Sequence, residues 1–181
     1  MACPFAGAQH IEVIPKAGIN FSRQAISDLD GERNMRGFQI GLAFDVQSAI
    51  PGLSVRPEIN YITKGTTVKS GITRTSYRLN YLDIPVFAKL SFQPVYIVAG
   101  PSLGVLLNNQ EKVAPAYGNL KSLDFGLQVG AGFRLPAGRS HIVIDGRYAF
   151  GIRDIADSGS RTIRNKGLQV SVGYPIPLNG R

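Results

Sequence analysis

Apolar and polar residues alternate along most of the chain, and this two-residue period is the feature that most limits its possible folds. Successive side chains of a β-strand point to opposite faces, so strict alternation predicts strands with one apolar and one polar face. The clearest case is residues 124–135, where Phe, Leu, Val and Ala alternate with Asp, Gly, Gln and Arg. Comparable segments are residues 11–21, 37–47, 53–64, 142–147 and 168–176.

Two further segments, residues 77–90 and 95–106, are less regular but are also predicted to be strands, which brings the total to eight. The first is apolar on both faces around Asp83 and Pro85. Because proline removes one donor from a hydrogen-bonded ladder, we expect a bulge at residues 83–85.

The predicted connections alternate in length. Long ones span residues 21–37, 64–77, 107–120 and 151–166, and short ones span residues 50–53, 91–94 and 136–139. Long extracellular loops and short periplasmic turns are typical of transmembrane barrels. The pattern therefore predicts an all-β fold, an eight-stranded antiparallel up-and-down transmembrane β-barrel, with both termini on the periplasmic side.

Composition separates the membrane barrel from other classes. Hydrophobic residues make up 44% of the 181 residues, and no apolar run reaches the roughly 18 residues of a membrane-spanning helix. The predicted strands reach the 9–11 residues that a tilted strand needs to cross a bilayer. A soluble barrel has the same period with the opposite orientation, apolar side chains inward. The uniform apolar face and the alternating connections favour the bacterial outer membrane.

In the membrane orientation the polar faces of the strands line the lumen. An eight-stranded barrel is just wide enough to be filled with side chains, so we expect a packed network of ion pairs in which opposite charges offset each other's desolvation. The residues expected in this network are Glu12, Lys16, Asp45, Arg56, Glu58, Asp124, Arg134, Asp145 and Arg147.

An ordered series of short motifs resembles the PorT-type outer-membrane β-barrel domain family. The matching stretches are residues 16–22, 37–41, 57–65, 79–85, 99–102 and 124–132. The resemblance covers most of residues 16–174 and implies an outer-membrane barrel in a cell envelope. The family has no general catalytic site to transfer.

Candidates for chemistry are few. The two histidines, His10 and His141, are expected at strand ends and not at a metal site. The acid pairs Asp28–Asp30 and Asp154–Asp157 are conceivable catalytic dyads, but loop carboxylates usually face solvent or basic neighbours. We therefore expect no enzyme activity and no cofactor, and a loop-based membrane enzyme remains a lesser alternative.

Basic residues gather in two long connections, and the chain has a formal charge of +8. Lysine and arginine bind phosphates well, so these residues are possible lipopolysaccharide contacts, with general loop solubility as the alternative. They are Lys64, Lys69, Arg74, Arg78, Arg161 and Arg164. Nucleic-acid binding is disfavoured, because the sequence shows no basic helix or aromatic platform.

The expected domain organisation is a remnant of an export signal peptide at residues 1–8, a barrel at residues 9–178 and a short tail at residues 179–181. The small residues of Ala6-Gly7-Ala8 fit the pattern before a signal-peptidase cut. The expected function is structural or interactive, through loops that contact lipopolysaccharide, a surface ligand or a protein partner in an envelope complex. The alternative is a narrow channel for ions or small solutes.

Overall fold

The computed structural model describes residues 11–26, 33–70, 73–107, 123–138, 140–152 and 163–178. Nine strands occur in these ranges. They are β1 (Ile11–Ile26), β2 (Arg33–Gln47), β3 (Leu53–Ser70), β4 (Thr73–Phe92), β5 (Val95–Leu106), β6 (Leu123–Ala137), β7 (Ser140–Gly151), β8 (Ile163–Gly173) and β9 (Ile176–Pro177). The proposed signal remnant and the tail lie outside the described residues.

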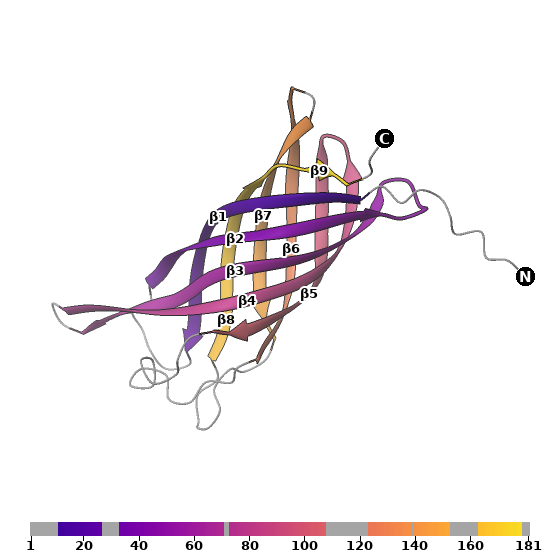
Figure 1. Ribbon diagram of the computed structural model, residues 1–181. Coiled ribbons are helices and arrows are strands. Elements are labelled where there is room, and N and C mark those ends of the chain that lie inside the picture. The colour runs from indigo at the N-terminus through magenta and orange to yellow at the C-terminus, as the bar shows by residue number, and fades with distance from the viewer. Residues whose placement is uncertain are drawn as a thin grey trace, which may run out of the picture.

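The strands form one closed antiparallel sheet. Each strand from β1 to β8 pairs with the next, and β1 also pairs with β8, with Lys16 opposite Gly173. The short β9 follows a break at Tyr174–Pro175 and pairs with β1 at Glu12 and Val13 (Figure 1). The predicted eight-stranded barrel is thus confirmed, with β9 as an unpredicted addition.

The prediction of a bulge at residues 83–85 is wrong. The β3–β4 ladder keeps one register from Leu53–Leu90 to Ser70–Thr73, and the β4–β5 ladder keeps its register across Pro85. The register shift lies instead between β2 and β3, in the stretch of β2 from Asn34 to Gln39. The β3–β4 pairs pass from Pro57–Val86 to Asn60–Asp83, so Pro85 interrupts the ladder locally without shifting its register.

The short turns form as predicted, and glycine provides the backbone conformation that two of them need. Gly52 has φ of 80° and Gly138 has φ of 64°, in the left-handed region that side chains with a Cβ rarely adopt. The prediction of a long connection at residues 64–77 is wrong, because β3 continues to Ser70 and β4 begins at Thr73. This β3–β4 hairpin projects beyond the barrel wall in Figure 1.

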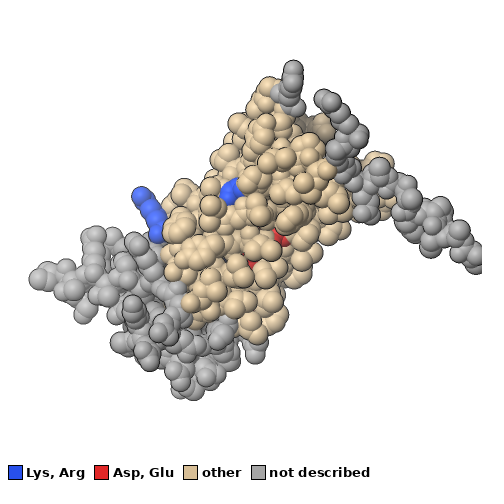
Figure 2. All heavy atoms as spheres, in the orientation of Figure 1, with Lys and Arg blue, Asp and Glu red and all other residues tan. Residues whose placement is uncertain are grey.

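The apolar face of each strand points outward. On β6, Phe125, Leu127 and Val129 are 44%, 46% and 44% exposed, whereas Asp124 and Gln128 on the opposite face are buried. Few charged side chains interrupt the face shown in Figure 2. This is the orientation of a barrel in lipid and the reverse of a soluble barrel. No helix in the described ranges is long and apolar enough to cross a membrane.

Candidate functional site

The centre of the lumen holds a cluster of ion pairs built around Glu58. The guanidinium of Arg147 donates two hydrogen bonds to the Glu58 carboxylate, each 2.7 Å long. The ammonium of Lys16 donates to the same carboxylate, and Asn60 Nδ2 donates to Glu58 Oε2 at 3.1 Å. Glu58 is fully buried and Arg147 is 2% exposed. Two cations therefore share one carboxylate that water does not reach.

Asp145 is the second carboxylate of this cluster and pairs with Arg147 and with a third cation, Arg56. Its Oδ2 accepts a hydrogen bond of 3.1 Å from Arg147, and its Oδ1 lies 3.4 Å from Arg56 Nη1. The hydroxyl of Tyr96 also donates to Asp145 Oδ1. The guanidinium of Arg56 lies 5.2 Å from the centre of the Tyr96 ring, at cation–π distance. Charge, hydrogen bonds and aromatic packing thus all close the middle of the barrel.

The two-residue strand period explains why these groups meet. Arg56, Glu58 and Asn60 alternate with Val55, Pro57 and Ile59 on β3, so all three polar side chains enter the lumen. Glycines on β6 leave space for large side chains of the two neighbouring strands, β5 and β7. A Cβ added to Gly130 would lie 2.8 Å from Arg147 Cγ, and one added to Gly132 would overlap the Tyr96 ring. Large residues on some strands therefore require glycine on another.

At the end of the lumen that carries the short turns, Asp45 pairs with two cations. Lys89 donates a hydrogen bond to Asp45 Oδ2, and Arg134 Nη2 lies 3.6 Å from the same atom. A polar cavity of about 260 Å³ opens beside them. Phe87, Tyr96, Val98 and Val143 form a buried cluster beside these groups, and the Lys89 ammonium lies 4.9 Å from the centre of the Tyr96 ring.

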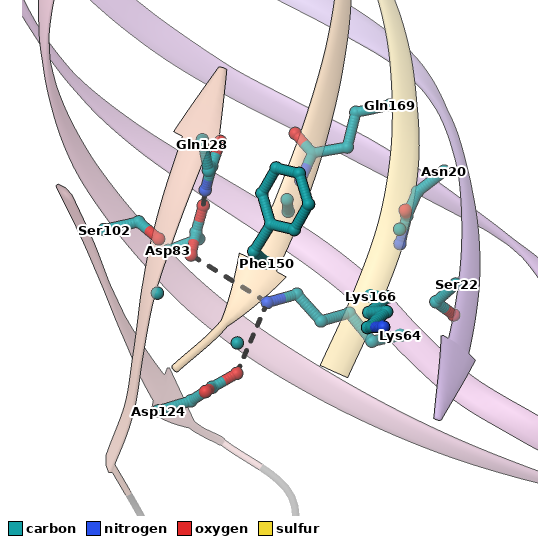
Figure 3. A pocket seen from close by; sticks show the side chains of 14 residues that line it. Asn20, Ser22, Lys64, Asp83, Ser102, Asp124, Gln128, Phe150, Lys166 and Gln169 are labelled. Carbon is teal, nitrogen blue, oxygen red and sulfur yellow. Dashed lines mark hydrogen bonds and ion pairs between the residues drawn. The ribbon is translucent and has the colours of Figure 1, made fainter. Parts of the chain in front are cut away.

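At the opposite end of the lumen, towards the long connections, Lys64 lies between two carboxylates (Figure 3). Its Nζ is 3.9 Å from Asp83 Oδ1 and 3.8 Å from Asp124 Oδ2. Gln128 donates a hydrogen bond of 2.8 Å to Asp83. The cavity among these side chains has a volume of only about 20 Å³, close to the space of a single water.

The structure brings the residues of the expected lumen network together to different degrees. Lys16, Asp45, Arg56, Glu58, Asp124, Asp145 and Arg147 are buried in the lumen. Arg134 is partly buried in its contact with Asp45, and Glu12 is half-buried near the start of β1. Sequence reasoning missed Asp83, Lys89 and Tyr96. Asp83 and Lys89 lie on β4, where inward apolar residues such as Phe87 hide the alternation.

Lys64 was expected to contact lipopolysaccharide from a loop, and its position requires a correction. It is 8% exposed and its ammonium lies inside the barrel, because β3 continues past it and its side chain stays on the luminal face. Lys69 lies on β3, Arg74 and Arg78 on β4 and Arg164 on β8. Arg161 lies outside the described residues.

Of the other candidate catalytic and metal-binding residues, only His141 lies within the described ranges. His141 lies near the start of β7 at the turn end, where Ser140 donates a hydrogen bond to the Pro175 carbonyl oxygen. Within the described ranges, no three His, Cys, Asp or Glu residues are placed to hold a metal ion. His10 and the pairs Asp28–Asp30 and Asp154–Asp157 fall outside those ranges.

A closed eight-stranded barrel with an apolar exterior and an ionic interior defines a small transmembrane barrel. The chain belongs to the family described as "Outer membrane protein beta-barrel domain", whose model matches residues 7–157. Membership in this family places the chain in the bacterial outer membrane. No curated protein sequence matches the chain.

Solved outer-membrane proteins share the fold at low sequence identity. OprG from Pseudomonas aeruginosa is 14% identical, with a TM-score of 0.55 over 94% of this chain and 98% of that one. Neisserial surface protein A is 14% identical, with a TM-score of 0.53 over 91% and 96% of the two chains. Ail, the attachment invasion locus protein of Yersinia pestis, is 15% identical, with a TM-score of 0.51 over 91% and 98%.

Proposed function

We propose that this protein is a non-conducting, non-enzymatic outer-membrane barrel that acts through contacts at the end bearing the long connections. The observation behind this proposal is the closed lumen. Arg56, Glu58 and Arg147 are each at most 2% exposed, so side chains fill the centre of the barrel. A barrel without a solvent path works through its surfaces, and the loop end is the part that reaches beyond the membrane.

A narrow channel is the second candidate, because polar side chains continue from Lys64 through Glu58 to Asp45. Packed side chains fill this route, since the Arg147 guanidinium lies 4.6 Å from the centre of the Phe87 ring and the Lys89 ammonium lies 4.9 Å from that of the Tyr96 ring. A hydrated ion would have to shed its water shell and displace ion pairs that already satisfy one another, which makes passage costly.

Planar-bilayer recording distinguishes the two candidates. We expect the wild-type barrel to show no steady single-channel steps, since the central side chains block the route. The double variant Glu58→Ser, Arg147→Ser removes one partner of each sign and serves as the matched opened barrel, in which steps should appear. Steady steps from the wild-type protein would contradict the closed-lumen proposal and support the channel.

The end of the barrel that bears the long connections could bind the phosphate groups of lipopolysaccharide. Lys69, Arg74, Arg78, Arg161 and Arg164 supply the positive charge, whereas Lys64 is excluded because its ammonium is buried with Asp83 and Asp124. We also propose that the chain belongs to the PorT-type branch of the family, because its series of motifs resembles that branch. We propose further that both termini lie in the periplasm, because they share one end of the barrel with the short turns.

We expect the triple variant Lys69→Gln, Arg74→Gln, Arg78→Gln to retain at least several-fold less lipopolysaccharide than wild type after detergent extraction. The reason is the loss of three charge-assisted contacts to phosphate. The variant Lys64→Gln is the control and should retain lipopolysaccharide like wild type if it folds. Unchanged retention in the triple variant would remove lipopolysaccharide as the partner of these residues.

A further inference from the structure

The β3–β4 hairpin extends well beyond the rest of the barrel. Its ladder continues to the Ser70–Thr73 pair, whereas β4 and β5 last pair at Tyr81 and Leu106. Seven residues of β4, Thr73–Leu79, therefore pair with β3 on one side and with no described strand on the other. At roughly 3.3 Å per residue this free edge is about 23 Å long.

The backbone direction along this edge follows from the hydrogen bonds closer to the barrel. The N–H of Leu107, which follows β5, donates to the carbonyl oxygen of Asn80 at 2.8 Å, so the Asn80 peptide groups face the β5 side. Residues of a strand alternate in the side to which their peptide groups point. Because the β3–β4 register is constant, the N–H and C=O groups of Arg74, Ser76 and Arg78 face the free edge.

The sequence of the hairpin suits strand pairing and restricts the partner. No proline occurs between Pro57 and Pro85, so every peptide on the edge keeps its donor. Thr, Val and Tyr, which favour strands, make up much of residues 66–77. Residues 65–82 contain three cations, Lys69, Arg74 and Arg78, and no Asp or Glu.

Like charges disfavour pairing between two copies of this edge, and opposite charges favour an acidic strand. We propose that the free edge of β4 binds an extended acidic segment of a protein partner by strand addition. This inference deepens the proposed interaction role and rests on it. Main-chain hydrogen bonds would supply affinity, and the cations would supply specificity.

The test uses the full chain in detergent micelles and a labelled peptide of alternating Glu and Val or Thr, capped at both ends. Fluorescence anisotropy should show saturable binding to wild type. The variant Ser76→Pro removes one edge-facing N–H without removing a β3–β4 bond, a position where edge strands tolerate proline. We expect it to bind the peptide at least 10-fold more weakly than the matched variant Ser76→Ala, which keeps that N–H.

Two further probes keep the result interpretable if Ser76→Pro does not fold, as judged by heat-modifiable gel migration. The same peptide methylated on alternate backbone nitrogens, and a version with Lys in place of Glu, should both fail to bind the wild-type barrel. Equal binding of the methylated peptide, or equal affinities of Ser76→Pro and Ser76→Ala, would overturn strand addition. Lipopolysaccharide binding that Ser76→Pro leaves unchanged, with no peptide binding by any variant, would also overturn it but leave the proposed loop-end role intact.

Discussion

The variant Glu58→Gln should lose about 3–5 kcal/mol of folding free energy, the effect of breaking a buried ion pair from one side. Glu58 is the shared acceptor for Lys16 and for both Nη atoms of Arg147, and all three side chains are buried. Glutamine keeps the size of the side chain but removes its charge. The two cations then remain in the lumen with too few anions, and water cannot reach them.

Urea unfolding in lipid vesicles would measure this loss. The matched control is Glu12→Gln, the same substitution at a half-buried site near the start of β1, and it should change stability by less than about 1 kcal/mol. Adding Lys16→Met to Glu58→Gln should recover part of the loss, because one unpaired cation is removed with its carboxylate. Equal losses for Glu58→Gln and Glu12→Gln would show that the central cluster does not stabilise the fold.

The variant Val129→Arg should destabilise the barrel by about 2–4 kcal/mol, the cost of a cation on the lipid face near the bilayer midplane. Val129 is 44% exposed near the middle of β6, between Ala99 of β5 and Tyr148 of β7. The same vesicle-based unfolding experiment gives the value.

The variant Leu135→Arg is a matched control on the same strand. Leu135 has a similar exposure, 42%, but lies near the turn end of β6, where an arginine can reach the interface. We expect a cost of about 0–1 kcal/mol there. If both substitutions cost the same, the apolar face would not show the depth dependence that a bilayer imposes.

The fold could be predicted from the sequence because lipid and lumen make opposite demands on successive residues. On β6 each demand is met at every second position, and the strand is recognisable from Asp124 to Leu135. The prediction of the strand ends failed where a strand continues past the membrane surface and no longer alternates between apolar and polar residues. The outer parts of β3 and β4 read as a polar loop, because strands that leave the bilayer no longer need an apolar face.

The sequence predicts that charged residues fill the lumen, but it does not predict which of them form ion pairs with one another. The sequence shows which residues face the lumen, and seven of the nine expected residues are buried there. It does not show the shear between strands, which decides that Arg147 meets Glu58 from across the barrel and that Lys89 meets Asp45. Lys64 shows the same limit, because its direction depends on where β3 ends.

Closure of the barrel between β1 and β8 has a consequence for biogenesis. The seven ladders from β1–β2 to β7–β8 join strands adjacent in sequence. The β1–β8 ladder, which joins Lys16 to Gly173, and the short β1–β9 ladder must wait for the C-terminal part of the chain. Until that moment two hydrogen-bonding edges are open at once, and neither can remain in a hydrocarbon medium. Insertion must therefore be completed as a single whole-chain event, and a chaperone or assembly machine that shields the N-terminal strand until the last one arrives would govern its yield.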